Sequence, residues 1–123
     1  MPLFVIQKHR KLKTNHFDLM LERGGKLATW SCQKMPLFKS SLVVAEKLLD
    51  HRLIYLTYEG KISRGRGSVT IWDKGTYLTE VWRPRLIIIT LQGKKIQERF
   101  LLFQPLSRRA GQTEWWIIQI KRD

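Results

Sequence analysis

Short apolar stretches separated by turn-forming residues run through most of the chain. Val, Ile, Leu, Thr and aromatic residues gather in runs of strand length, and Gly, Pro, Asn and charged residues separate these runs. This pattern is typical of an antiparallel β domain. Arg23-Gly24-Gly25 and Asp73-Lys74-Gly75 each predict a tight hairpin, because such residues tolerate a positive φ.

So many short strands in one chain favour closure, since a closed sheet has no exposed edges. We therefore predict an all-β, mainly antiparallel fold: a small closed or nearly closed β-barrel with short helical or irregular connections. The expected strands are Leu3–Gln7, Phe17–Glu22, Lys26–Ser31, Arg52–Tyr58, Ser68–Asp73, Gly75–Val81, Leu86–Gln92, Glu98–Pro105 and Trp115–Lys121.

Two segments have a less regular pattern. In Ser40–Asp50 the leucines could line a helix, whereas Val43-Val44 favours a strand, so both alternatives stay open. Arg10 to Asn15 carries three positive charges and no apolar period, which predicts an exposed basic loop. Polar connections are also expected at Gln92–Lys95 and at Ser107–Gln112.

Length and charge narrow the class of protein. The 123 residues fit one domain, and 43% of them are hydrophobic, enough for a packed core. The 23 Lys and Arg outnumber the 10 Asp and Glu, giving a formal net charge of +13. Such an excess attracts polyanions, with nucleic acid the usual partner. Anionic membrane and a merely soluble basic surface are the alternatives.

The lack of targeting signals in the sequence and its single cysteine indicate where in the cell the protein is located. The apolar runs have strand length, well short of a membrane span, and the N-terminus lacks a signal-peptide layout. We expect a cytoplasmic protein with no membrane association. The single cysteine, Cys32, cannot form an internal disulfide, which agrees with a reducing compartment.

Three polar side chains could form a metal site. His16 and Asp18 are two residues apart, so in a strand they point to the same face. His9 would join them if the Arg10–Asn15 loop folds back. Imidazole and carboxylate together suit zinc, manganese or iron, so the residue types do not choose the metal. The same residues also fit ordinary surface or hydrogen-bonded histidines.

A second polar cluster lies downstream. Asp50-His51-Arg52 and Tyr55 precede Ser63-Arg64-Gly65-Arg66-Gly67, whose glycine-flanked arginines could present guanidinium groups to phosphate. The alternative is an arginine-bearing turn on a soluble surface. Most of the five tryptophans are expected in the core, with one of Trp115 and Trp116 facing outward, where it could stack on a base.

Several ordered blocks of sequence resemble a known family. Phe4-Val5-Ile6-Gln7-Lys8-His9 and His16-Phe17-Asp18-Leu19-Met20-Leu21-Glu22 resemble the opening of the 3′-phosphoesterase domain of bacterial and archaeal DNA ligase D. Later blocks follow in the family's order: Lys26–Trp30, Asp50–Tyr55, Tyr58–Gly60, Gly67–Thr76 and Trp116–Asp123. The combination of these blocks resembles a stand-alone branch of these domains, the DNA polymerase-ligase N-terminal domain family.

The resemblance implies a fold, an activity and a site. The fold would be a single compact β-barrel over residues 1–123. The activity would be a metal-dependent phosphoesterase, usually supported by manganese, that removes a 3′-terminal ribonucleotide or 3′-phosphate in end joining. His9, His16 and Asp18 would hold the metal. The other catalytic residues would be His51, Tyr55, Gln7 and Glu22. The residues in contact with nucleic acid would be Arg52, Arg64, Arg66, Lys8 and Arg10.

The resemblance also implies partners, and three departures from it matter. The expected partners of a monomeric chain are DNA or RNA-tipped DNA 3′ ends and a separate DNA ligase or polymerase-ligase. Met20 stands where the family carries an arginine, Val43 lies near another expected arginine, and the His9–His16 interval is one residue longer than expected. Arg52, Arg64 or Arg66 could replace the lost phosphate contacts. The alternative function is a catalytically weak or inactive nucleic-acid end-binding module.

Overall fold

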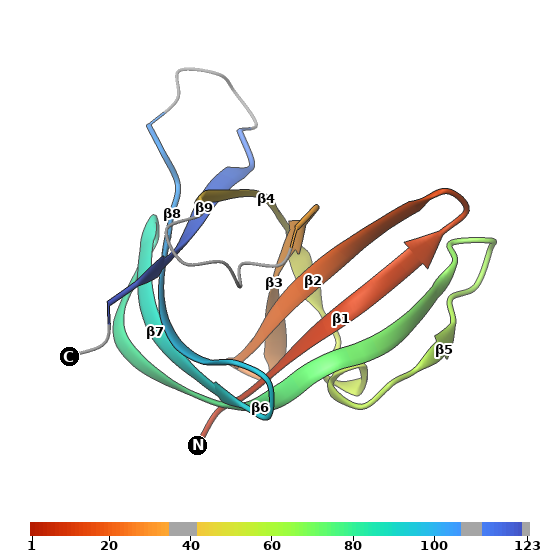
Figure 1. Ribbon diagram of the computed structural model, residues 1–123, viewed down its shortest axis with the longest axis horizontal. Helices are drawn as coiled ribbons and strands as arrows, with labels where there is room; N and C mark the ends of the chain where they lie inside the picture. The colour runs from red at the N-terminus through yellow and green to blue at the C-terminus, as the bar shows by residue number, and fades with distance from the viewer. Residues whose placement is uncertain (35–41, 107–111, 122–123) are drawn as a thin grey trace.

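The strands of the chain form one antiparallel sheet that closes into a ring (Figure 1). The computed structural model describes residues 1–34, 42–106 and 112–121. The strand order is β1-β2-β3-β4-β9-β8-β7-β6-β5, and a further pairing of β1 with β6 closes the ring. The strands are β1 Leu3–Lys11, β2 Thr14–Arg23, β3 Lys26–Cys32, β4 Leu42–His51, β5 Gly60–Lys61, β6 Ser68–Arg83, β7 Leu86–Gly93, β8 Gln97–Phe103 and β9 Glu114–Ile120.

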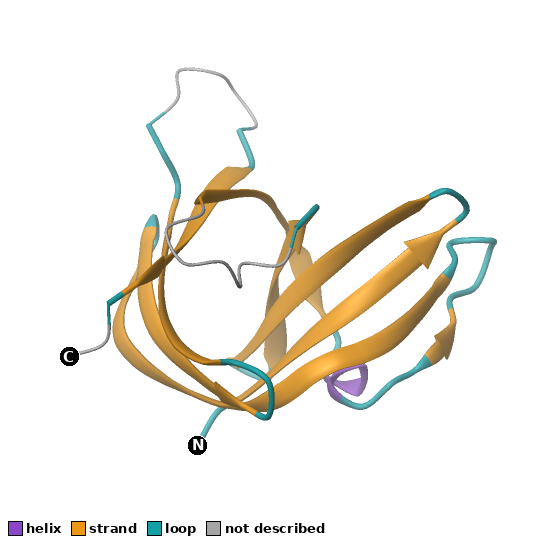
Figure 2. Cartoon of the chain, viewed as in Figure 1, coloured by secondary structure: helices purple, strands orange, loops and turns teal. Residues whose placement is uncertain are grey.

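The predicted all-β barrel is therefore confirmed. Among residues 1–34, 42–106 and 112–121, the helical structure is one 3₁₀ turn, η1, at Leu53–Leu56 (purple in Figure 2). Within the described part of the chain, helices are too short to cross a membrane. The β1–β2 hairpin and the first half of β6 project beyond the ring on one side, and β5 lies outside β6 (Figure 1).

Alternation along the strands separates the core from the outer face. On β1, Phe4 and Ile6 point into the ring and join the main apolar cluster. Trp30 lies fully buried in that cluster, with its ring edge-on to Trp82 and Trp115. Burying each such side chain contributes roughly 1.5–3 kcal/mol, so the ring interior holds the barrel together.

A second, smaller apolar cluster lies on the outer face of the same strands. It consists of the buried side chains of Val5, Met20 and Leu27. Tyr55 and Leu56 of η1 pack against it from outside, together with Ile71 of β6. This cluster holds η1 against the outer face of the barrel.

The prediction of a strand at Arg52–Tyr58 is wrong. The chain turns there into η1, with i→i+3 hydrogen bonds from Tyr55 N to the Arg52 carbonyl (3.1 Å) and from Thr57 N to the Ile54 carbonyl (3.2 Å). The β-prone residues of this segment cover the outer apolar cluster instead of pairing with a strand. Tertiary packing thus overrides the local β propensity.

The hairpin predicted at Asp73-Lys74-Gly75 is also wrong, because β6 runs unbroken through these residues. The buried Asp73 carboxylate accepts hydrogen bonds from the backbone N–H groups of Lys74, Lys94, Lys95 and Ile96, at 2.9–3.1 Å. Asp73 therefore organises the turn between β7 and β8, which is the polar connection predicted at Gln92–Lys95. The Asp73 side chain thus stabilises a turn about twenty residues further along the chain, and not a turn at its own position.

Three other expectations have mixed outcomes. The β2–β3 hairpin is confirmed, with Gly24 and Gly25 at φ values of 62° and 81°. Leu42–His51 is a strand, the second of the two alternatives. The basic loop at Arg10–Asn15 is wrong in extent, because β1 and β2 continue to a turn at Leu12 and Lys13. The predicted connection at Ser107–Gln112 lies almost wholly outside the described residues.

Candidate metal centre and the cavities beside it

The β1–β2 hairpin places the candidate ligands on one face. His9 lies directly opposite His16 in the register, and Gln7 lies directly opposite Asp18. Residues paired across antiparallel strands share a face, so all four side chains lie on the outer side, continuous with Val5 and Met20. The extra residue between His9 and His16 is accommodated by the turn at Leu12, whose φ of 50° is positive.

The donor atoms of three of these side chains converge. His9 Nδ1 lies 3.0 Å from His16 Nε2, and the two rings have centroids 4.5 Å apart. The Asp18 carboxylate lies 3.4 Å from His16 Nε2 and 4.0 Å from His9 Nδ1. The three ligand atoms lie within 4.8 Å of one another. One ion could contact all of them.

A backbone carbonyl selects the tautomer of the His9 imidazole. His9 Nε2 lies 2.6 Å from the Arg66 carbonyl, which can only accept, so Nε2 carries the proton and Nδ1 keeps its lone pair. The close approach depends on Gly67, at a φ of 88°, where a Cβ would overlap the Arg10 carbonyl. The glycine-flanked arginine segment thus supplies a backbone contact that the sequence pattern did not predict.

The buried carboxylate fits a cation. Asp18 is 4% exposed, and its Oδ1 atom has no hydrogen-bond partner among the described residues. The nearby Asp18 carboxylate raises the pKa of His16, against the lowering effect of partial burial. Two imidazoles and a carboxylate are the donor set of zinc, manganese and iron sites. These residues therefore fit a divalent transition metal.

A small cavity of about 110 Å³ opens beside the ligands. His9 and Asp18 line it together with Gln7, His51 and Tyr55. His51, the last residue of β4, donates from Nδ1 to the Leu49 carbonyl at 3.0 Å, which leaves Nε2 available. The His51 and Tyr55 rings meet edge to face with centroids 5.7 Å apart. Arg66 also lines the cavity, so six of the sequence-predicted site residues share it.

Gln7 connects this cavity to η1. Its side chain is 1% exposed, and Nε2 donates to the Tyr55 carbonyl at 3.0 Å and to the Tyr58 carbonyl at 3.2 Å. These two bonds hold the segment that carries Tyr55 against the strand that carries His9. Gln7 therefore positions other residues of the site.

The two substitutions relative to the expected family pattern have different surroundings. Met20 is 1% exposed, belongs to the outer apolar cluster and also lines the cavity beside Asp18. It gives the cavity an apolar wall where the family pattern has a cation. Val43 points into the barrel core.

Other predicted site residues lie elsewhere. Glu22 is at the far end of β2, beyond Met20, and its Oε1 accepts the N–H of Leu3 at 3.0 Å. Lys8 and Arg10 alternate with His9 and so point to the opposite face of β1. Arg64 lies in the turn before β6, with a φ of 62°. None of these four is among the described residues that line the cavity at Asp18.

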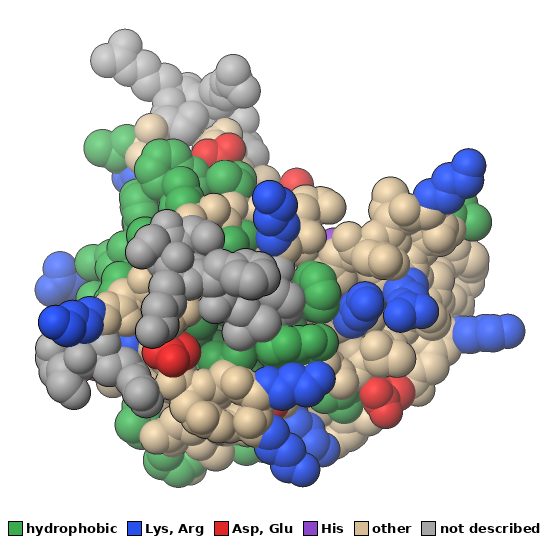
Figure 3. Space-filling view, viewed as in Figure 1, with side chains coloured by type: hydrophobic (Ala, Val, Ile, Leu, Met, Phe, Trp, Pro, Cys, Tyr) green, Lys and Arg blue, Asp and Glu red, His purple; other side chains and the backbone are tan. Residues whose placement is uncertain are grey.

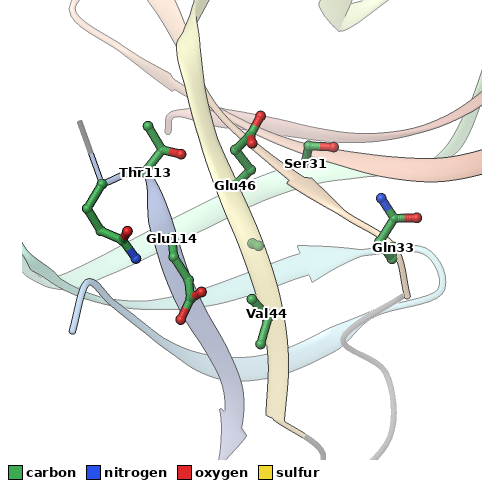
Figure 4. Close-up of a pocket in the computed structure, with 8 residues that line it drawn as sticks. Ser31, Gln33, Val44, Glu46, Thr113 and Glu114 are labelled. Carbon is green, nitrogen blue, oxygen red and sulfur yellow. The ribbon is translucent and has the colours of Figure 1, made fainter. Parts of the chain in front are cut away.

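A larger cavity, of about 410 Å³, has the wrong charge for a phosphate. Glu46 of β4 and Glu114 of β9 are paired directly across the sheet and both line it (Figure 4). Ser31, Gln33 and Thr113 provide further polar groups. Two carboxylates repel an anionic ligand, so this cavity is a poor site for nucleic acid.

Basic side chains are scattered over the face of the molecule that Figure 3 shows. Figure 3 shows Lys and Arg side chains spread over the half formed by β1, β2 and β6, with few acidic side chains between them. This distribution agrees with the net charge of +13. Trp116 is the outward-facing member of its pair, but it is half-buried, and its indole N–H donates to Glu114 at 2.8 Å.

Comparisons with known proteins converge on one family. A family model described as the DNA ligase D 3′-phosphoesterase domain matches residues 7–104. The multifunctional non-homologous end joining protein LigD of Mycobacterium bovis is 39% identical over 109 residues, covering 82% of this chain and 14% of the relative. The corresponding protein of Mycolicibacterium smegmatis is 36% identical over 116 residues, covering 82% of the chain and 15% of the relative.

A more distant relative covers more of the chain. The LigD protein of Pseudomonas aeruginosa is 30% identical over 128 residues, covering 96% of this chain and 15% of the relative. The chain therefore spans only about one-seventh of the length of these relatives, between 14% and 15%.

Proposed function

Because the chain belongs to the DNA ligase D 3′-phosphoesterase domain family, we propose that it is a metal-dependent phosphoesterase that processes the 3′ ends of DNA in end joining. The observation that carries the proposal is the convergence of His9, His16 and the unpartnered Asp18 oxygen within 4.8 Å. The substrates would be DNA or primer–template ends that carry a 3′-phosphate or a 3′-terminal ribonucleotide.

The ligand set would hold a divalent ion, with manganese our first expectation and zinc the alternative. Such an ion supplies positive charge that polarises the phosphoryl oxygens of the substrate. The chain's own residues would orient that ion: the Arg66 carbonyl keeps His9 Nδ1 free to bind, and Asp18 supplies the negative charge.

His51 is the candidate acid. Its Nδ1–H is held by the Leu49 carbonyl, so a proton on Nε2 would face the cavity. In hydrolysis of a 3′-phosphate, water bonds to phosphorus, the bond from phosphorus to O3′ breaks, and His51 would give its proton to O3′. The products are inorganic phosphate and a 3′-hydroxyl that a ligase can use. Tyr55, edge-on to His51, would restrict the imidazole's orientation.

The test is release of phosphate from a primer–template with a 3′-phosphate, and of the nucleoside from one with a 3′-terminal ribonucleotide, with manganese or zinc added. We expect His9→Ala, His16→Ala and Asp18→Ala to lose activity at least 100-fold. Asp50→Ala is the matched control, because Asp50 is an exposed carboxylate whose ion pair in the described structure is with Lys47. Equal activity in Asp18→Ala and the parent would refute the proposal.

A second function follows from Met20. The apolar wall that it gives the cavity removes a charge that would help the reaction. Salt-sensitive binding of DNA ends without turnover, unchanged in the ligand variants, would instead indicate an end-binding module.

A further inference from the structure

A second cavity, of about 280 Å³, lies beside the candidate metal centre and is strongly basic. It lies between η1 and the turn that joins β5 to β6, and Arg52, Lys61 and Arg66 all line it. No carboxylate is among the described residues that form its wall. Three cations with no acidic neighbour in the wall favour an anion as the occupant.

The two cavities share part of their walls. Tyr55, Ile62 and Arg66 line both the basic cavity and the one at Asp18. The two cavities are therefore direct neighbours on the surface of the domain. Successive phosphates of a nucleic-acid strand could occupy the two cavities in turn.

Hydrogen bonds brace the wall of the basic cavity. Arg66 Nε donates to the Ser63 carbonyl at 3.0 Å, and Nη2 donates to Ser63 Oγ at 3.2 Å, which restrains the guanidinium. The Tyr58 hydroxyl donates to the Lys61 carbonyl, joining β5 to the end of the η1 segment. Gln7 holds that same segment through the Tyr58 carbonyl. A preorganised wall loses little side-chain entropy when it binds a ligand.

We propose that the basic cavity binds the internucleotide phosphate on the 5′ side of the terminal nucleoside, while the 3′-terminal phosphate lies at the metal centre. This inference rests on the proposed function. At a 3′ end the strand continues only in the 5′ direction, so a cavity adjoining the centre receives the next phosphate upstream. Arg52 and Lys61 would contact it, and Arg66 lies between the two phosphates.

This position offers a reason for the substitution at position 20. Met20 gives the cavity at Asp18 an apolar wall, whereas Arg52 and Lys61 line the neighbouring basic cavity, where the next phosphate of the nucleic acid would lie. Binding energy would then come from the upstream phosphate instead of the reacting one. Such a site lowers KM more than it raises kcat, because the upstream contact is the same in the ground and transition states.

The experiment compares three 3′-phosphorylated oligonucleotides of equal length. One has only phosphodiesters, one has a neutral methylphosphonate at the internal linkage nearest the 3′ end, and one has it five linkages further upstream. Binding is measured by fluorescence anisotropy in EDTA, and phosphate release is measured with manganese. The variant Arg52→Gln/Lys61→Gln removes two exposed cations of the cavity. Arg83→Gln/Lys121→Gln is the control, because Arg83 is exposed at the end of β6 opposite to the one that pairs with β5, and Lys121 is exposed after β9.

We expect the nearest methylphosphonate to weaken binding and raise KM about tenfold in the parent chain, and the distant one to change either by less than threefold. Arg52→Gln/Lys61→Gln should lose this dependence on the position of the methylphosphonate, whereas Arg83→Gln/Lys121→Gln should keep it. Equal effects of the two methylphosphonates in the parent would overturn the proposed subsite, even if phosphate is released. Position-dependent binding without phosphate release under any metal would instead refute the proposed function and keep the subsite.

Discussion

Replacing Asp18 by Asn should stabilise the metal-free protein and weaken the metal-bound one. Asp18 is 4% exposed, and its Oδ1 atom has no partner among the described residues. A buried charged oxygen without a hydrogen bond costs about 1–3 kcal/mol. The carboxylate is therefore a cost to folding unless a cation neutralises it, and the neutral amide should relieve about 1 kcal/mol.

The opposite effect is expected when the ion is present. A ligand at 100 times its dissociation constant stabilises the native state by about 2.7 kcal/mol. For 123 residues, with an unfolding entropy of about 2.1 cal/mol/K per residue near 60 °C, this corresponds to a rise in Tm of roughly 10 °C. Asp18→Asn should lose most of that rise, because it removes the only anionic ligand of the three.

The assay is thermal unfolding followed by tryptophan fluorescence, without and with manganese or zinc. The metal-free comparison is made in EDTA at pH 9. At lower pH a charged His16, whose pKa the nearby Asp18 carboxylate raises, would offset the cost of the carboxylate. Asp50→Asn makes the same chemical change at an exposed position and should alter neither curve. If the free energy of unfolding of metal-free Asp18→Asn is lower than that of the parent by more than 1 kcal/mol, the carboxylate stabilises the metal-free fold and the prediction is wrong.

Three further predictions concern the surroundings of the site. Gln7→Ala removes the two hydrogen bonds that hold η1 and the residues after it, so kcat should fall about tenfold while metal affinity stays nearly unchanged. A tenfold loss of metal affinity would contradict a role of Gln7 in positioning η1. Asp73→Ala leaves the buried N–H of Ile96 and its neighbours in the β7–β8 turn without an acceptor. The free energy of unfolding, measured in urea, should therefore fall by about 3–4 kcal/mol, and a fall below 1 kcal/mol would refute this role of Asp73. Burial raises the pKa of the Cys32 thiol to about 12, so the native chain at pH 8 should resist a thiol-specific disulfide reagent that reacts with the unfolded chain. The contribution of Cys32 to stability should be lost as pH rises from about 9 towards 12, and a Cys32→Ala variant with the same pH profile would contradict this.

The barrel could be predicted from the sequence because alternation and turn residues act locally. Gly24 and Gly25 form their hairpin without help from the rest of the chain, since both adopt a positive φ. Asp73 misled the prediction because its carboxylate forms a turn with residues some twenty positions away. Likewise, η1 contains β-prone residues, and only the outer cluster at Val5 and Met20 makes a covering helical turn favourable.

The candidate site could be predicted in its residue types but not in its contacts. The two-residue spacing of His16 and Asp18 places both on one face of β2, as the sequence indicates. The partner of His9 Nε2 is a backbone carbonyl, and no side-chain pattern identifies which carbonyl will approach. Glu22 matches the family pattern in sequence, yet six positions along an extended strand separate it from His16 by about 20 Å.

The position of Met20 shows how stability and chemistry meet in this domain. The inner residues of β1 and β2 build the barrel core, and the outer residues change along the strands from the apolar cluster at Val5 to the candidate ligands at His9. Met20 lies at the boundary between the two, buried against Leu27 and open to the cavity at Asp18. A cation there would face the phosphate only if its stem replaced the thioether in the apolar cluster. Methionine instead favours the packing that holds η1 in place. Tyr55 of η1 lines both the cavity at Asp18 and the basic cavity, so this packing shapes both.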